Sequence, residues 1–284
     1  MPIDEIFPDF QRLRTQVEAF ASLGARLRAP DDDYDDEVRS ALDEVVAAIG
    51  LVGLEDLTDD DRRTVAAMVG AALGQAASIF EEATAAPGWR HTDPDVLDGQ
   101  GRASSNIVPH IAAIVGDAPM RSYLDVGTGA GFLAIAAARQ WPDARIVGLD
   151  VWEPALERAR LHVAEAGLDD RVEVRNQDVT TLDEVDEFDY AGIPAMFLPG
   201  DVLAAAVERC VVATRPGGLV SVGVFRTPED PLRAATERLR MVRDCGTAHT
   251  VESVMDVCRD AGLEPEILNP EVPIPIAFVG GRVG

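Results

Sequence analysis

Residues 122–139 read SYLDVGTGAGFLAIAAAR, and this stretch decides the fold. It opens with apolar and aromatic residues around one acid, continues with three glycines at alternate positions, and ends in an alanine-rich run. The pattern predicts a buried strand, a tight turn and a helix packed closely on a sheet, because glycine serves where the backbone takes unusual dihedral angles or approaches a ligand. The free N–H groups of the first helical turn would then face whatever lies at the carboxyl end of the strand.

The 284 residues are enough for one large domain, or for a core domain with a smaller one attached. With 47% apolar and 26% charged residues the composition is that of a soluble globular protein. We identify no apolar run long enough to span a bilayer and no secretory signal. The three widely spaced cysteines fit a reducing compartment and no zinc motif. We therefore expect a cytoplasmic protein that has no metal centre and does not bind membranes.

The chain carries a formal net charge of −25, with 50 acidic residues against 25 basic ones, and every basic residue is arginine. The absence of lysine excludes Schiff-base enzymes, P-loop NTPases and protein kinases of the usual type. The negative charge repels phosphate backbones, which disfavours a nucleic-acid partner. A small-molecule substrate is the expectation that remains.

The first 116 residues are predicted to be helical, because apolar residues recur three or four positions apart. These stripes cover residues 6–27, 38–49 and 65–80. We expect the first of them to be buried. A turn-rich loop, PGWRHTDP (87–94), follows, and Pro109 should interrupt the next helix, which starts near residue 95.

After residue 120 strands alternate with helices, which is typical of a parallel sheet with crossover connections. The predicted strands are 122–126, 145–150, 171–175, 187–193 and 218–225, followed by a terminal pair, 264–269 and 274–282. The predicted helices are 131–140, 153–166, 201–213, 231–243 and 250–261. The terminal strands are close enough in sequence to pair in antiparallel fashion.

The glycine turn is an imperfect match to a dinucleotide site, because the third glycine of such a site stands where this chain has Phe132. Two acids at the ends of later strands add to the pattern. Asp150 lies 19 residues beyond the last glycine of the turn, where a carboxylate can accept both hydroxyl hydrogens of a ribose. Asp178, after the third strand, can accept from an exocyclic amine such as that of adenine.

Three segments resemble the first three motifs of class I S-adenosylmethionine-dependent methyltransferases. They are SYLDVGTGAGFLA (122–134), GLDVWEPALERAR (148–160) and VEVRNQDV (172–179). The resemblance covers about residues 118–284, including the terminal strand pair that separates this fold from NAD-binding ones. It implies an α/β fold with a Rossmann-like, seven-stranded, mostly parallel sheet, preceded here by an all-helical N-terminal region, and S-adenosylmethionine as cofactor.

By this resemblance the glycine turn would border the methionine part of the cofactor. Asp125 would place the amino group, Asp150 the ribose and Asp178 the adenine amine. The expected cofactor-binding residues are Asp125, Gly127, Thr128, Gly129, Gly131, Asp150, Val151, Trp152, Asp178, Val179 and Ile193. For each acid taken singly, a helix cap or a turn former is the alternative interpretation.

The fourth strand reads FDYAGIPAMFLPG and lacks the Asn-Pro-Pro-Tyr or Asp-Pro-Pro-Tyr tetrad of enzymes that methylate nucleobase or glutamine amino groups. No acid cluster follows it, which disfavours a metal-dependent catechol enzyme. Met196 and Phe197 instead predict an apolar wall for the acceptor, or alternatively packing for the next helix. Trp89 is a further candidate for contacting the substrate. Arg226 could hold an anionic group of the substrate or form a surface salt bridge.

Methyl transfer needs a base only when the acceptor is protonated, as in a phenol or alcohol. His91 is the first candidate, because its loop also carries Trp89 and Arg90. His249, after the fifth strand, is the second. His110 is interpreted as structural and His162 as solvated.

We therefore expect two regions: helices at 1–116 that complete the acceptor site as a lid, a homodimer interface or both, and a cofactor-binding domain at 117–284. The predicted function is methyl transfer from S-adenosylmethionine to a small molecule, with the acceptor atom (O, N or C) open. The alternatives are an NAD-dependent oxidoreductase, a non-catalytic cofactor-binding scaffold and a protein methyltransferase.

Overall fold

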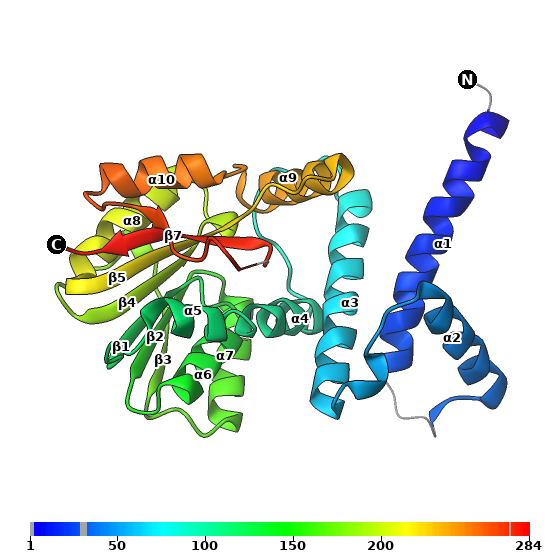
Figure 1. The fold of residues 1–284 in the computed structure, drawn as a ribbon, viewed down its shortest axis with the longest axis horizontal. Helices are drawn as coiled ribbons and strands as arrows, with labels where there is room; N and C mark the ends of the chain where they lie inside the picture. The colour runs from blue at the N-terminus through cyan, green and yellow to red at the C-terminus, as the bar shows by residue number, and fades with distance from the viewer. Residues whose placement is uncertain (1–2, 29–32, 273) are drawn as a thin grey trace. The chain divides into compact units, whose positions relative to one another are not determined.

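The computed structural model describes residues 3–28, 33–272 and 274–284, which form two compact units (Figure 1). The helical unit contains residues 1–83 and 93–103, and the sheet unit contains residues 84–92 and 104–284. The loop that carries Trp89 and His91 is thus part of the sheet unit. The functional division at residue 116 stays a prediction.

The helical unit is built from helices whose ends are marked in the sequence. They are α1 (Ile3–Arg28), α2 (Asp36–Ile49), the short 3-10 helix η2 (Leu54–Asp56), α3 (Asp59–Glu81) and most of α4 (Pro94–Ser105). Thr58 and Asp61 form a reciprocal capping box at the start of α3, as the sequence predicts for a threonine before a run of acids. Gly50 ends α2 in the left-handed conformation, with φ 74°.

The core of the helical unit is small and brings α1 against α3. Leu23 and Leu27 of α1 are buried with Val69 of α3. Gly24 allows this approach, because a Cβ there would lie 2.6 Å from a methyl carbon of Val69. The prediction of one buried stripe along α1 is correct only for Leu23 and Leu27. The remaining apolar side chains of that stripe are exposed, because the core covers only the last turns of the helix.

By length and composition α3 (Asp59–Glu81) could cross a membrane, so the expectation that no run reaches that length was wrong. Core helices of soluble proteins pass the same test. Such core helices are mostly buried, whereas only 11% of the apolar window of α3 is buried inside the protein, Val69 and Ala71 among it.

The sheet unit contains seven strands in the order β3-β2-β1-β4-β5-β7-β6. The strands are β1 (Ser122–Val126), β2 (Arg145–Asp150), β3 (Val172–Asn176), β4 (Phe188–Pro194), β5 (Thr214–Phe225), β6 (Glu266–Ile267) and β7 (Ile276–Arg282). Strands β1 to β5 pair in parallel, and β7 is antiparallel to β5 and β6. This confirms the predicted fold class.

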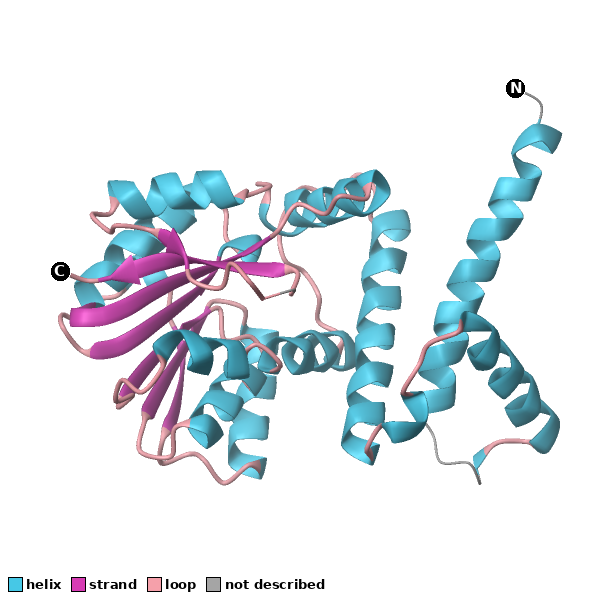
Figure 2. Cartoon of the chain, in the orientation of Figure 1, coloured by secondary structure: helices cyan, strands magenta, loops and turns pink. Residues whose placement is uncertain are grey.

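Helices cover both faces of the sheet (Figure 2). They are α5 (Val108–Val115), α6 (Phe132–Gln140), α7 (Glu153–Glu165), α8 (Gly200–Ala213) and α10 (Val251–Asp260), while α9 (Pro231–Cys245) lies beyond the carboxyl ends of the strands. Residues of α5, α6 and α7 pack with Tyr123 and Tyr190 on one face, and residues of α8 and α10 pack with Leu124 and Val222 on the other. The break between α4 and α5 falls just before Pro109, as predicted.

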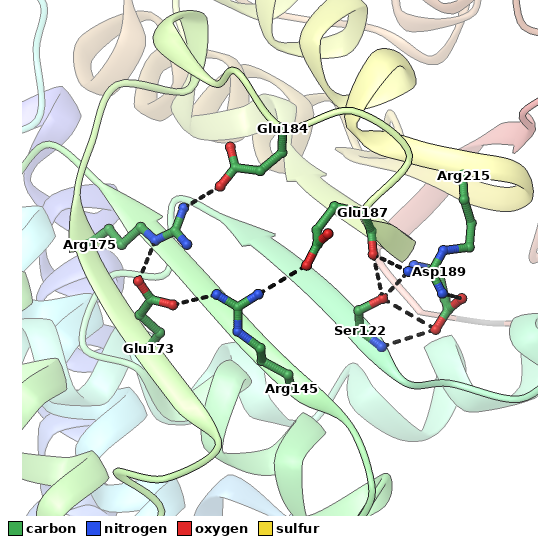
Figure 3. A network of polar contacts seen from close by, with 8 residues as sticks. All are labelled: Ser122, Arg145, Glu173, Arg175, Glu184, Glu187, Asp189 and Arg215. Carbon is green, nitrogen blue, oxygen red and sulfur yellow. Dashed lines mark hydrogen bonds and ion pairs between the residues drawn. The ribbon is translucent and has the colours of Figure 1, made fainter.

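The amino-terminal edge of the sheet is fastened by arginines and acids (Figure 3). Arg145 of β2 bridges Glu173 of β3 (2.7 Å) and Glu187 beside β4 (3.2 Å). A hydrogen bond from Arg175 lowers the pKa of Glu173 to about 2. The planar guanidinium group suits such bridges, because its several N–H donors can reach more than one carboxylate. The opposite, carboxyl edge is where β1, β2, β3 and β4 present the predicted site residues.

Candidate active site

The glycine turn after β1 adopts a conformation that suits only glycine. Gly127, Gly129 and Gly131 have φ values of 66°, 54° and 81°. Two of them also stand against neighbouring segments: a Cβ on Gly131 would lie 3.1 Å from the Cβ of Ala159, and one on Gly127 would lie 3.1 Å from Pro194. The turn therefore packs against α7 and against the end of β4, and it leaves the first N–H groups of α6 without a side-chain cap.

Asp150, at the end of β2, holds this turn. Its Oδ2 accepts from the N–H of Gly129 (2.9 Å), and its Oδ1 accepts from the N–H of Trp152 (2.8 Å). Burial raises the pKa of the carboxyl group, and these backbone donors oppose that rise. Each carboxylate oxygen keeps a second lone pair, so the group can still accept from ribose hydroxyls.

Asp125 is buried on β1, with 5% of the residue exposed. Its Oδ2 has no hydrogen bond of good geometry among the described residues, although the hydroxyl of Thr128 lies close to the carboxyl group. Burial raises the pKa of Asp125 to about 7; the hydroxyl of Thr128 opposes this rise, and the nearby charge of Asp150 adds to it. A buried acid with a free oxygen suits a cationic partner such as an amino group.

Asp178 follows β3 and is exposed. Its Oδ1 accepts from the N–H and from the hydroxyl of Thr180, both at 2.8 Å, and so caps the 3-10 helix η3 (Val179–Thr181). This is the capping role that the sequence left open as an alternative. Among the flanking apolar residues, Val179 and Ile193 are buried in the core below the site, whereas Val151 is 63% exposed.

Residues 84–92 bring several predicted site residues together within the sheet unit. The ring of Trp89 meets the ring of Phe197 edge-on, with centroids 5.5 Å apart, and meets the imidazole of His91 at 4.8 Å. The indole N–H of Trp152 donates to the carbonyl oxygen of His91 (2.8 Å). Candidates for the substrate surface, the base and the cofactor site are therefore joined by a continuous set of contacts.

Two other candidates are engaged by local partners. His249 is buried, and its Nε2 donates to the carbonyl oxygen of Leu198 (2.9 Å). Arg226 donates through Nη2 to the carbonyl oxygen (2.7 Å) and to Oδ1 (3.2 Å) of Asn269, which ties the end of β5 to the chain before β7. Met196 is buried and precedes Phe197 in the short 3-10 helix η4 (Ala195–Phe197).

His162 corrects one expectation. The sequence predicts a solvated side chain, but Nδ1 of His162 donates to the carbonyl oxygen of Ala130 (2.9 Å), and its ring lies 4.4 Å from that of Phe132. This histidine on α7 thus supports the glycine turn. Sequence reasoning missed the contact because it joins residues on two different elements, and nothing in the local pattern signals it.

Comparisons with known proteins agree with this geometry. A family model described as a methyltransferase domain matches residues 124–218. The ubiquinone biosynthesis O-methyltransferase of Bordetella avium is 31% identical over 166 residues, covering 55% of this chain and 67% of that protein. The chain spans a smaller part of other relatives: it covers 33% of the tRNA1(Val) (adenine(37)-N6)-methyltransferase of Vibrio campbellii, at 33% identity over 79 residues and 28% of this chain.

Two solved structures are similar over their full length. Human N-acetylserotonin methyltransferase in complex with S-adenosylmethionine superposes with a TM-score of 0.71 at 13% identity, covering 100% of this chain and 98% of that one. An O-methyltransferase family protein from Burkholderia thailandensis gives 0.64 at 16% identity, with 99% and 97% covered. These two structures support the fold. The sequence relatives include enzymes named for small-molecule and for RNA substrates, so they do not decide the class of acceptor. Taken with the glycine turn and its acids, the matches decide for a sulfonium cofactor over a nicotinamide one, and the chain belongs to the class I S-adenosylmethionine-dependent methyltransferases.

Proposed function

We propose that the protein transfers the methyl group of S-adenosylmethionine to a small-molecule acceptor, and that His91 accepts the proton when the acceptor is a phenol or an alcohol. The contact of Trp89 with His91 and Phe197 carries this proposal. It joins an aromatic surface to a base within the unit that holds the cofactor motifs. Such a surface suits an aromatic or other apolar acceptor and excludes water from it.

The residues at the carboxyl edge fit the cofactor. The unpartnered Oδ2 of Asp125 would receive the amino group, Asp150 the ribose hydroxyls and Asp178 the adenine amine, while the glycine turn would border the methionine chain. The cofactor supplies an activated methyl group on a sulfonium. The protein then contributes proximity and alignment: the bond from methyl carbon to sulfur breaks, a bond to the acceptor atom forms, and the acceptor proton leaves to the base.

His91 is the better base candidate of the two that the sequence offers. The turn after β4 reads Pro-Ala-Met-Phe (194–197) and has no titratable side chain, so the base must come from another segment. Nε2 of His249 is already used by the carbonyl of Leu198, and that ring is buried. His91 is only partly buried, and its ring lies against Trp89.

Transfer of a labelled methyl group tests the acceptor class. The protein is incubated with S-adenosylmethionine labelled in the methyl group and, separately, with a small-molecule extract, a protein extract and total RNA. We expect label in the small-molecule fraction only, because residues 194–197 lack the tetrad of amide and nucleobase enzymes and the net charge of −25 repels RNA. Label confined to the protein or RNA fraction would overturn the proposal. The Asp150→Ala variant, assayed at a cofactor concentration below its raised Kd, serves as the low-activity control.

Asp125 gives the cofactor site a pH dependence. Its pKa of about 7 in the fold lies above the usual 3.8 of the unfolded chain. Between about pH 4 and 7 the folded protein therefore holds a proton that the unfolded chain does not, so the contribution of this group to stability decreases as the pH rises through that window. A cationic amino group binds the ionised form, so binding requires this proton to leave.

We accordingly expect the affinity for S-adenosylhomocysteine, which keeps the amino group, to be about tenfold lower at pH 6 than at pH 8. Titration calorimetry in buffers of different ionisation enthalpy should show release of one proton at pH 6. In Asp125→Asn the affinity should be lower at both pH values, and the proton release should be absent. Equal affinity at pH 6 and 8 for the native protein would show that Asp125 does not contact the amino group.

A homodimer through α1 belongs to the same proposal. The first five turns of α1 carry an apolar stripe whose side chains are 40–59% exposed: Ile6, Phe7, Phe10, Leu13, Val17 and Phe20. Two copies of this stripe can cover each other in a symmetric contact. Sedimentation equilibrium should give twice the chain mass of 30.4 kDa, and Phe10→Glu should give the monomer. A native monomer at micromolar concentration would exclude the dimer.

We also place the protein in the cytoplasm, since its three cysteines are unpaired and buried.

A further inference from the structure

Residues 84–92, called the strap here, are attached to the sheet unit at three different elements. The attachments are Gly88 N–H to the carbonyl of Arg243 on α9 (2.8 Å), the ring of Trp89 on that of Phe197 (5.5 Å), and the indole N–H of Trp152 to the carbonyl of His91 (2.8 Å). Of these three attachments, the last is the one that reaches a residue of the cofactor motifs. It therefore connects the cofactor site with the proposed acceptor surface.

We propose that Trp152 is a positioning residue that couples occupation of the cofactor site to the order of the strap. Its backbone N–H is bound by Oδ1 of Asp150 (2.8 Å), and Oδ2 of the same carboxylate binds the N–H of Gly129 in the glycine turn. One carboxylate thus fixes both the turn and the residue whose side chain holds the strap. That the strap contacts the methyl acceptor rests on the proposed function.

The choice of tryptophan at this position has no local explanation. Trp152 is the N-cap of α7, and its side chain makes no capping hydrogen bond. Serine, threonine, aspartate and asparagine are the residues that stabilise a helix at that position. A half-buried indole there gives up that stabilisation, and its one polar group, Nε1, is used for the carbonyl of His91. The side chain therefore serves the strap and not the helix.

Ribose hydroxyls bound to Asp150 would restrain the carboxylate and, through its hydrogen bond, the backbone N–H of Trp152. The strap should then open less often when the cofactor is bound. Coupling of this kind is reciprocal, so an acceptor that binds the ordered strap would raise the affinity for the cofactor by the same factor. The bond is made by a backbone carbonyl, so it survives any change of the His91 side chain.

Hydrogen exchange tests the coupling without knowledge of the acceptor. Peptides that cover the strap are followed by mass spectrometry in the presence and absence of saturating S-adenosylhomocysteine. In the native protein we expect the ligand to slow exchange at the strap by about fivefold or more. In Trp152→Phe, which keeps an aromatic ring and loses the N–H, this slowing should disappear even at a concentration of S-adenosylhomocysteine that saturates the variant, as set by the variant's own Kd from titration calorimetry.

Trp141→Phe is the matched control, because this tryptophan follows α6 and its ring contacts that of Tyr123, with centroids 6.0 Å apart, away from the strap. It should retain the full effect of the ligand. Unchanged exchange at the native strap despite bound ligand, or an undiminished effect in Trp152→Phe, would overturn the coupling. These outcomes are separate from the labelling experiment: a protein acceptor there would refute the proposed acceptor class and leave the exchange result intact.

Discussion

The Asp150→Ala variant is expected to bind S-adenosylhomocysteine more weakly by about 2–3 kcal/mol, which is roughly a 30- to 160-fold rise in Kd. The carboxylate of Asp150 has two roles that alanine removes together. It holds the N–H groups of Gly129 and Trp152, and it presents the lone pairs that a ribose needs. Titration calorimetry at pH 8, where Asp125 is ionised, measures the effect without interference from that second acid.

Two further variants separate these roles. Asp150→Asn retains one carbonyl oxygen as an acceptor, so it should lose less affinity than the alanine variant. Asp178→Ala removes the proposed acceptor of the adenine amine and should raise Kd by less than about fivefold, in keeping with the roughly 1 kcal/mol that a hydrogen bond contributes. If Asp150→Ala bound S-adenosylhomocysteine as tightly as the native protein, the assignment of the ribose to this carboxylate would be wrong.

The fold was predictable from the sequence because its main signals are local. Glycines at alternate positions after a buried strand predict the left-handed turn, since only glycine adopts such angles freely. The alternation of strands and helices predicts the parallel sheet, and the short connection before the last strand predicts the antiparallel pair. The hydrogen bond from Trp152 N–H to Asp150 spans two residues and is also of a local type, so the sequence could have indicated it.

The contacts that organise the candidate site were not predictable, because they join residues distant in the chain. The bond from Trp152 to His91 spans 61 residues, and the one from His162 to Ala130 spans 32. No periodicity or motif in either partner signals such a pair. The apolar stripe of α1 shows the complementary difficulty: its spacing predicts an apolar surface correctly, but the pattern does not say whether that surface is buried within the chain or exposed, as most of it is.

Charge composition predicted the kind of polar contact but not its location. A chain without lysine must build its ion pairs with arginine or histidine. In the structure Arg145, at the amino end of β2, shares Glu173 with Arg175, which lies nearer the carboxyl end of β3 (Figure 3). The glycine turn follows the carboxyl end of β1, whereas Arg145 lies beside Ser122 at the amino end, so this network stabilises the scaffold and leaves the carboxyl edge to acids and aromatic groups. Because the strands run parallel, their amino ends lie together at one edge and their carboxyl ends, with the candidate site residues, lie together at the other.

Replacing His91 with asparagine should lower kcat by about 10²- to 10⁴-fold for a phenol or alcohol acceptor identified by the labelling experiment. Asparagine cannot take the acceptor proton. The half-buried Asp244 has a pKa raised by burial, which the charges of Arg240 and Arg243 oppose.

The same variant separates the base from the strap. Trp152 binds the backbone carbonyl of His91, which asparagine also has, so the Kd for S-adenosylhomocysteine and the exchange at the strap should stay within about twofold of native values. His110→Asn, a change at a partly buried histidine on α5, is the matched control and should leave kcat unchanged. A normal kcat in His91→Asn with a hydroxyl acceptor would remove His91 from the reaction, and a loss of cofactor affinity without a change in kcat would assign its side chain to the cofactor site instead.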